Sequence, residues 1–340
     1  MTAAAPEQAR TETARDGAAP QATASVRWRL ALKVALSALI LGLLLHTMDL
    51  GRLSVLLAGV DPWLACLAIV VLMTVPAISI PRWRAILSSL GEELPTPTVA
   101  RALYVGAFFN QVLPSSVGGD AWRIWFCTRA GVPLGVAANS VLIERLVGLV
   151  AVVLCFCLTI PVLLGRVGDH PARWLLWLML AGCVGVLLGL AVLAAIAGRL
   201  DRSPLLRPLA SLGRALSTVA RSSHVGLLLW TGLLGQAAAI LAFYLVSRGA
   251  GAPLTLVDCA VTLAPGLLIA LVPVSLGGWG VREGAFVLLL GFYGMRPEQS
   301  LVVSVLFGLA LLAASMPGLV LWLRLPAAAS RRTDPSPDRR

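Results

Sequence analysis

The long apolar runs constrain this chain more than any other feature of its sequence. A helix needs about 20 mostly apolar residues to cross the hydrocarbon core of a bilayer. The runs that approach or exceed this length are Leu30–Leu45, Trp63–Ile80, Val141–Leu164, Trp174–Ala197, Val225–Val246 and Leu301–Leu323. Hydrophobic residues make up 58% of the chain and charged residues 13%, which is too little charge to cover a soluble domain of 340 residues. The sequence therefore predicts an all-α polytopic membrane protein.

The distribution of arginine predicts how the spans are oriented. Loops that remain in the cytoplasm carry an excess of basic residues. Arginines gather before the first run, in the loop that holds Arg82, in the connection 198–224 and at the C-terminus. We therefore expect a multi-pass protein of the cell's inner (plasma) membrane, with its N- and C-termini in the cytoplasm.

Two further segments, 98–138 and 255–298, contain apolar stretches too short to be ordinary spans. Each segment must enter and leave the membrane on the same side, because the loop charges otherwise fall on the wrong sides. We predict a re-entrant hairpin, or a pair of half-helices, in each. The fold class is then about six full spans plus two re-entrant or broken-helix hairpins.

The connection 198–224 has the pattern of an amphipathic helix. Apolar residues recur at helical spacing and arginines recur every seven residues: Leu205, Leu209, Leu212, Leu216 and Val219 against Arg207, Arg214 and Arg221. Such a helix lies on the membrane surface and meets anionic headgroups with its cationic face. We predict this placement on the cytoplasmic leaflet, and a surface for a soluble partner is the alternative.

The two interrupted segments share a motif. The matching positions, 159 residues apart, are Pro114, Ser116, Gly118, Gly119 and Arg123 in the first segment and Pro273, Ser275, Gly277, Gly278 and Arg282 in the second. At one residue more, Ser140 and Gly148 match Ser300 and Gly308. Paired glycines match easily by chance in a chain with 32 glycines, but this many positions at fixed spacing do not. We predict an inverted-topology repeat, an architecture that many transporters use.

The repeat gives the chain three predicted parts. A disordered cytoplasmic tail occupies 1–26, a membrane domain 27–325 and a disordered basic tail 326–340. Within the membrane domain, repeat one covers 27–165 and repeat two covers 171–325, and the amphipathic connection lies inside the second repeat.

The shared motif has the chemistry of an anion site at a broken helix. Proline ends the entering half-helix, and paired glycines allow positive φ and the close approach of a ligand. The next half-helix presents its positive N-terminus, which favours an anion. Arg123 and Arg282 each follow the second glycine by four residues, and a guanidinium matches the geometry of phosphate.

Charged residues lie inside or beside apolar stretches at Asp120, Arg123, Glu144, Arg145, Arg282 and Glu283. Each costs about 2.5–3.5 kcal/mol at the centre of a bilayer, so we expect these residues to line a cavity or to pair with one another. A purely structural pairing of Arg123 with Asp120 or Glu144 is the alternative. Arg145 turns about 100° from Glu144 on a helix, so the two do not point to one spot. Asn110 either lines the cavity or caps freed backbone.

Other kinds of site find little support. A net charge of +11 suggests nucleic acid in a soluble protein, but here membrane topology accounts for the arginines. The six cysteines lack CxxC spacing and a histidine cluster, so we expect no metal site. The sequence contains no Walker motif, nucleophile elbow or catalytic triad. We expect no cofactor, no nucleic-acid partner and no enzymatic activity.

Two stretches resemble the lysylphosphatidylglycerol synthase transmembrane-region family. They are Asn110–Arg123 followed by Ser140–Arg145, and Pro273–Glu283, and the likeness extends over Leu30–Leu323. The resemblance implies a flippase-like membrane domain. In two-part members of the family this domain moves aminoacylated phosphatidylglycerol between leaflets, and a separate cytosolic domain makes that lipid. We identify no such synthase domain in these 340 residues, so we do not extend lysyl transfer to them.

The leading interpretation is a flippase-like protein that binds an anionic lipid, phospholipid or polyprenyl-linked, and moves it between leaflets. Its headgroup phosphate would lie between Arg123 and Arg282. The candidate substrate-binding residues are Asn110, Ser116, Gly118, Gly119, Asp120, Arg123, Glu144, Arg145, Ser275, Gly277, Gly278, Arg282 and Glu283. The alternatives are a membrane scaffold or accessory subunit of a lipid or glycan synthase, which would be its partner, and an intramembrane lipid transferase.

Overall fold

The computed structural model describes residues 55–56, 58–113, 117–200, 204–270 and 280–324, and all the regular secondary structure within them is helical. The helices are α3 (Pro62–Ser89), α4 (Thr96–Val112), α5 (Gly118–Arg129), α6 (Leu134–Val167), α7 (Ala172–Leu200), η2 (Pro204–Leu206), α8 (Arg207–Ala220), α9 (Val225–Gly249), α10 (Leu256–Ala270), α11 (Val281–Gly291) and α12 (Pro297–Leu323). The predicted span Leu30–Leu45 and both predicted tails lie outside the described residues.

Five described helices are long and apolar enough to cross a membrane: α3, α6, α7, α9 and α12. They contain the apolar runs from which the spans were predicted, and their windows have mean hydropathies of 1.8 to 2.9. The prediction of an all-α polytopic membrane protein is confirmed. The helices also extend beyond the apolar runs, and α3 continues through Ser89, well past the end of its run at Ile80.

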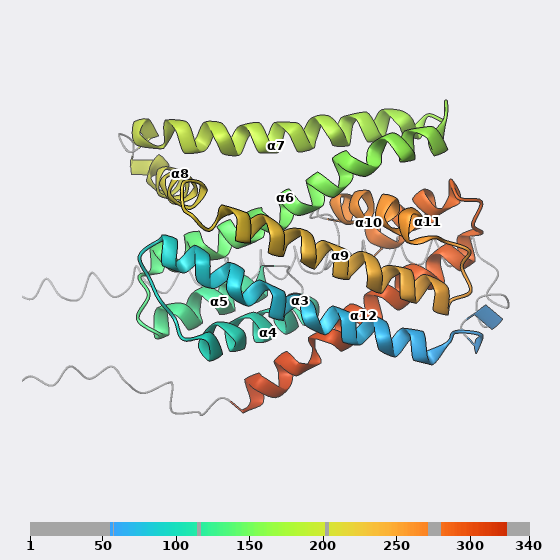
Figure 1. Ribbon diagram of the computed structural model, residues 1–340, viewed down its shortest axis with the longest axis horizontal. Helices are drawn as coiled ribbons and strands as arrows, with labels where there is room; N and C mark the ends of the chain where they lie inside the picture. The colour runs from blue at the N-terminus through green and yellow to red at the C-terminus, as the bar shows by residue number, and fades with distance from the viewer. Residues whose placement is uncertain (1–54, 57, 114–116, 201–203, 271–279, 325–340) are drawn as a thin grey trace, which may run out of the picture.

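The two interrupted segments form two helical hairpins, as predicted. α4 and α5 have 17 and 12 residues, and α10 and α11 have 15 and 11, so none is long enough to span. The outer ends of the first hairpin, at Leu94 and Val132, share an apolar cluster with Val219 of α8. The outer ends of the second, at Leu254 and Met295, share another cluster near the end of α9. The hairpins therefore enter the bundle from opposite ends (Figure 1).

Each hairpin packs against a long helix from a distant part of the chain. α4 lies against α12, α10 lies against α6, and α3 lies along α9 between them (Figure 1). The crossing of α4 and α12 is close, because a Cβ at Gly318 would lie 2.1 Å from the carbonyl oxygen of Tyr104. A glycine at this position lets the two backbones approach, which is how helices commonly pack in membranes.

The connection between α7 and α9 forms the predicted amphipathic helix, α8. It packs against the end of α7 through Gly213, where a Cβ would lie 2.6 Å from the carbonyl oxygen of Leu193. Leu212 and Leu216 pack against the apolar cluster at this end of the bundle, whereas Leu205 and Leu209 are exposed. Part of the apolar face therefore packs on protein, and the exposed leucines at its start are the part open to a membrane surface.

Candidate functional site

A cluster of buried charges lies where α3, α5 and α6 meet. The side chains of Arg82, Asp120, Arg123 and Glu144 have relative exposures of 5–7%. Arg145 is partly exposed and joins the cluster from its edge. Charges at this degree of burial persist when they are paired with one another or with a ligand, because desolvating a lone charge is very costly.

Glu144 is at the centre of the cluster. Its Oε1 accepts a hydrogen bond from Arg82 Nη2 at 2.5 Å, and its Oε2 accepts one from Arg123 Nη1 at 2.8 Å. Both carboxylate oxygens thus accept hydrogen bonds from guanidinium groups. Such charge-assisted hydrogen bonds are the strongest that a carboxylate forms with a side chain. Through this one carboxylate, α6 is tied to both α3 and α5.

Asp120 forms the second acidic contact of the cluster. It forms an ion pair with Arg145, and its Oδ1 lies 4.0 Å from Arg123 Nη1. Glu144 binds Arg82 and Arg123 while Arg145 binds Asp120, so the neighbouring side chains Glu144 and Arg145 do point to different spots. The predicted contacts of Arg123 with Asp120 and Glu144 are both present, and they join one network rather than compete.

Aromatic and hydroxyl groups fix the positions of the two inner arginines. The Arg123 guanidinium lies 4.0 Å from the centroid of the Trp83 ring, a cation–π contact. Trp83 Nε1 in turn donates a hydrogen bond to Ser140 Oγ at 3.2 Å. Arg82 Nη2 also donates to Ser79 Oγ at 2.8 Å. These contacts hold the two guanidinium groups in place.

Some donors of the cluster remain unsatisfied. Within the described part of the chain, Arg82 Nε, Arg123 Nε and Arg123 Nη2 are buried and have no hydrogen-bond partner. The cluster also contains three arginines against two carboxylates. Buried polar groups in proteins are nearly always hydrogen-bonded, so donors of this kind indicate a place for water or an anion.

The paired glycines serve a different purpose from the one predicted. Gly118 and Gly119 begin α5 and are not among the described glycines with positive φ, so that expectation is wrong. A Cβ at Gly119 would lie 2.0 Å from the carbonyl oxygen of Gly106, so the pair lets α5 pack closely on α4. Gly119 N–H donates to Asn110 Oδ1 at 2.9 Å, which makes Asn110 a cap for freed backbone. Asn110 Oδ1 also lies 3.4 Å from Arg145 Nη2.

The second motif gives a smaller, local arrangement. Arg282 donates to its neighbour Glu283 from Nη2 at 2.6 Å and from Nε at 3.1 Å, and Glu283 Oε2 accepts from Gly280 N–H at 2.5 Å. The Arg282 guanidinium also lies against Gly308 of α12. The predicted candidates Ser116, Ser275, Gly277 and Gly278 lie outside the described residues.

The structure therefore gathers Asn110, Gly119, Asp120, Arg123, Glu144 and Arg145 at the first hairpin, with Gly118 beside them, and Arg282 with Glu283 at the second. Arg82 is the member of the first group that sequence reasoning missed, because it was counted as a loop charge. Its signal was position: it follows Pro81 directly, close enough to the apolar run for the helix to continue through it. Among the described residues, no group of three or more His, Cys, Asp or Glu side chains could hold a metal ion.

Comparison with known proteins places these features in a family. The UPF0104 membrane protein MJ1595 of Methanocaldococcus jannaschii is 28% identical to the chain over 98 residues, which are 28% of this chain and 29% of that protein. The match thus spans less than a third of the relative's length. The model of the lysylphosphatidylglycerol synthase TM region matches residues 30–318, which include both hairpins and all five described spans apart from the end of α12. The chain belongs to the lysylphosphatidylglycerol synthase TM region family of membrane proteins.

Proposed function

We propose that this protein binds the anionic headgroup of a membrane lipid at the Arg82–Arg123–Glu144 cluster and moves the lipid between leaflets. The observation that carries the proposal is the set of buried guanidinium N–H groups without a partner, Arg123 Nη2 and Nε and Arg82 Nε. A phosphate ester offers several acceptor oxygens and one negative charge. It would satisfy these donors and balance the excess arginine of the cluster.

Glu144 has a defined part in this proposal. It binds both inner arginines through separate oxygens, so it keeps their guanidinium groups apart and oriented while the site is empty. Each guanidinium still has further donors for a ligand, so the headgroup need not displace the carboxylate. Asp120 balances Arg145 at the edge of the cluster in the same way.

The arrangement of the halves supports alternating access. We propose that the two halves are an inverted repeat in which α3 corresponds to α9, α4 to α10, α5 to α11 and α6 to α12. The packing of α4 on α12 and of α10 on α6 supports this correspondence, because exchanging the halves turns one contact into the other. Rocking of one half against the other would then expose the cluster to each side in turn.

An apolar cavity supports a lipid, rather than a free anion, as the cargo. It has a volume of about 590 Å³ and lies between α6, α7, α10 and α11. Leu149, Met179, Leu268 and Leu288 are among its lining residues, and Gly182 and Gly284 leave room in its walls. A cavity with this lining accepts hydrocarbon, so the tail of a lipid has apolar surroundings inside the protein as well as in the bilayer.

The test is leaflet exchange of fluorescent anionic lipids in proteoliposomes. We expect the wild-type protein to speed exchange and Arg123→Ala to abolish the increase. Arg129→Ala is the matched control, because Arg129 ends the same helix, is exposed and stacks on Trp125 instead. Arg123→Lys should retain part of the activity, since it keeps the charge and loses the planar donor pair.

Slow exchange of every lipid by the wild-type protein would contradict the flippase and favour an accessory subunit of a synthase. In that case Arg123→Ala should leave co-purification with the synthase intact. Fast exchange by both the wild type and Arg123→Ala would instead support a flippase, but it would show that the lipid does not bind at the cluster as it crosses.

We further propose that the α8 end of the bundle faces the cytoplasm, in the inner (plasma) membrane. The exposed arginines Arg84, Arg101 and Arg207 support this orientation, because basic loops remain in the cytoplasm. A reporter enzyme that is active on one side of the membrane, fused after Arg340, tests the orientation. Activity of a periplasmic reporter in this position would contradict it.

A further inference from the structure

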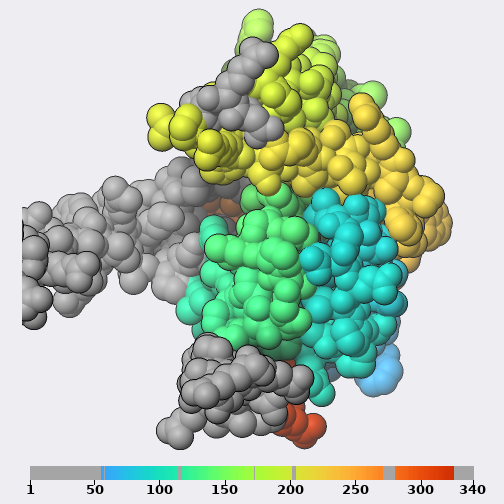
Figure 2. Space-filling model, turned by 90° about the vertical axis from the view of Figure 1, so that its left-hand side faces the viewer, coloured from blue at the N-terminus to red at the C-terminus, as the bar shows by residue number. Residues whose placement is uncertain are grey.

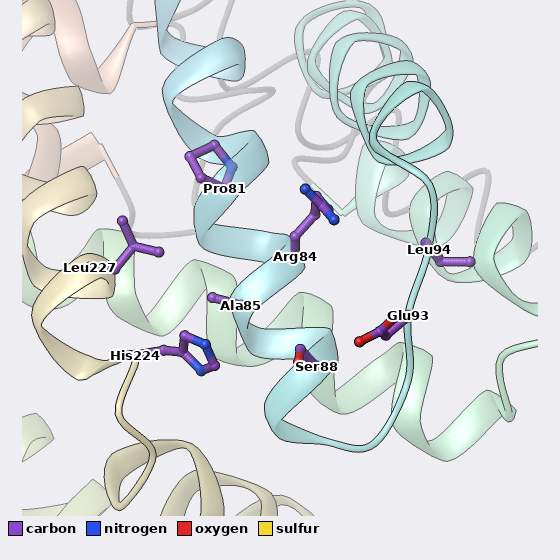
Figure 3. A pocket seen from close by; sticks show the side chains of 8 residues that line it. All are labelled: Pro81, Arg84, Ala85, Ser88, Glu93, Leu94, His224 and Leu227. Atoms are coloured by element: carbon purple, nitrogen blue, oxygen red, sulfur yellow. The ribbon is translucent and has the colours of Figure 1, made fainter.

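A groove lies on the outer face of α3 at the α8 end of the bundle. Its volume is about 280 Å³, and its floor is formed by Pro81, Arg84, Ala85 and Ser88 of α3. The start of α9 and the segment between α3 and α4 form the two walls (Figure 3). Arg84 follows Arg82 by two residues, so on a helix it points about 200° away, toward the groove and not toward the buried cluster.

The groove contains one basic and one acidic side chain without an ion-pair partner. Arg84 on the floor and Glu93 on the wall are both exposed, and neither forms an ion pair within the described residues. Arg82 and Glu144, by contrast, are buried and bound to each other. Opposite charges that line one groove and remain unpaired suit a ligand that carries both signs.

The polarity of the groove changes along the direction of α3. The end of the groove farthest from the α8 end is apolar and is lined by Pro81 and by Leu227 of α9 (Figure 3). Arg84 lies one turn nearer the α8 end and Ser88 a further turn along, and Glu93 lies level with Ser88 on the segment that returns from α3 to α4 (Figure 3). Along α3 the groove therefore passes from apolar side chains to Arg84 and then to the level of Ser88 and Glu93. An aminophospholipid in a leaflet has the complementary order of hydrocarbon, phosphate and ammonium.

The start of α9 adds a second feature that favours phosphate. His224 is the N-cap of α9, and no side chain caps the first backbone N–H groups of that helix. His224 Nδ1 lies 3.3 Å from Ser89 Oγ, which fixes the ring against the end of α3. Figure 2 faces this end of the molecule, where the start of α9 lies beside the end of α3. The partial positive charge of the helix N-terminus reinforces that of Arg84.

We propose that this groove binds the headgroup of a zwitterionic aminophospholipid from the leaflet at the α8 end, with its phosphate on Arg84 and its ammonium on Glu93. The site is separate from the lipid path proposed above, since none of its lining residues belongs to the Arg82–Arg123–Glu144 cluster. The proposal for this groove does not depend on whether the protein moves lipids between leaflets.

The test is lipid binding to the full chain in detergent, measured by native mass spectrometry. Phosphatidylethanolamine, phosphatidylglycerol and phosphatidylcholine with the same acyl chains are titrated separately. We expect phosphatidylethanolamine to bind roughly tenfold more tightly than the other two. Phosphatidylglycerol has no cation for Glu93, and the quaternary ammonium of phosphatidylcholine has no N–H to donate to it.

Two variants locate the site. Glu93→Gln should reduce phosphatidylethanolamine binding to the level of phosphatidylcholine, whereas Arg84→Ala should weaken binding of all three lipids. Glu92→Gln and Arg101→Ala are the matched controls, because they remove the same charges from residues nearby that do not line the groove. Arg123→Ala should leave the preference unchanged.

Three results would overturn the proposal. The first is equal binding of the three lipids by the wild type, and the second is a preference that survives Glu93→Gln. The third is loss of the preference in Arg123→Ala, which would place the bound lipid in the buried cluster. Free glycerophosphoethanolamine serves as a competitor, and displacement at the same concentration as the lipid would reassign the groove to a soluble zwitterion.

Discussion

The two hairpins share a sequence motif but hold their arginines in different ways. Arg123 of α5 binds Glu144 on another helix, and Glu144 also binds Arg82 on a third. Arg282 of α11 binds Glu283, its neighbour in the chain. The first arrangement joins three helices through charge, whereas Arg282 has a carboxylate partner next to it on its own helix. A repeated motif can therefore keep its arginine while the partner of that arginine changes.

The sequence spacing that relates the two motifs suggests a reason for the difference. The spacing that relates Ser140 to Ser300 relates Glu144 to Ser304. Ser304 is fully buried, and its Oγ has no hydrogen-bond partner within the described residues. A serine is short and neutral, so it cannot supply the counter-charge across the helix interface. At the second motif a counter-charge comes from Glu283, next to the arginine.

The largest effect should come from Glu144→Gln. It leaves Arg82 and Arg123 buried without their common counter-charge, and breaking a buried ion pair costs about 3–5 kcal/mol. Glu283→Gln should cost about 1.5–3 kcal/mol, because one arginine and the Gly280 N–H lose their acceptor. Denaturant unfolding in detergent micelles measures both. Equal losses for the two variants would break the contrast between the hairpins.

Gly119→Ala should have the next largest effect. Its Cβ would meet the backbone of Gly106, which cannot move away as a side chain can, so we expect the free energy of unfolding to fall by about 1–3 kcal/mol. Gly284→Ala on α11 is the matched change, since a Cβ there meets nothing within 4 Å. It should leave stability unchanged or slightly raised. A cost at Gly284 similar to that at Gly119 would show that both hairpins need the same close packing.

Asn110→Ala should cost about 1 kcal/mol, the usual contribution of a side chain that caps a helix. The first hairpin caps α5 from another helix, through Asn110 to Gly119 N–H, whereas the second caps α11 from within, through Glu283. Gln111→Ala is the control, because its side chain is exposed. Thermal unfolding monitored by circular dichroism measures the change, and no loss at Asn110 would remove its capping role.

The smallest effect should come from Gly308→Ala. Its Cβ would lie 2.1 Å from Arg282 Nη2, but the end of an arginine side chain can shift, so the cost should be about 1 kcal/mol or less. Gly148 is the matching position in the first half and has open space around it, so Gly148→Ala should cost nothing. The melting temperatures of Gly308→Ala and Gly148→Ala, each measured against the wild type, give the two costs. A larger loss at Gly148 would mean that the two halves do not correspond in the way the sequence aligns them.

Hydropathy and loop charge predicted most of the fold because both depend on short stretches of chain. A run of apolar residues forms a span wherever it lies, and the charge at the ends of the spans limits how many can cross, which is why both hairpins could be predicted without any contact between helices. The amphipathic pattern of α8 was local in the same sense. Its contact with α7 at Gly213 was not predictable, because nothing in the sequence indicates which helix it meets.

The site was predictable only in part, for a related reason. Asp120, Arg123 and Glu144 are conspicuous because they interrupt apolar sequence. Arg82 and Arg84 look alike in a charge count, and which of them is buried depends on the face that α3 turns to α6. The glycine pair was given the wrong role because a motif does not reveal whether the missing Cβ makes room for a ligand or for Gly106.

The last turns of α3 would connect the two proposed sites. Pro81 removes a backbone hydrogen bond at the start of this segment and favours bending there. Arg82 and Arg84 both follow Pro81, one turned to the buried network and the other to the outer groove. A small bend at Pro81 would move both side chains together. A ligand in the groove would then change the affinity of the Arg82–Arg123–Glu144 cluster for its anionic headgroup. A headgroup in the cluster would change the affinity of the groove by the same factor.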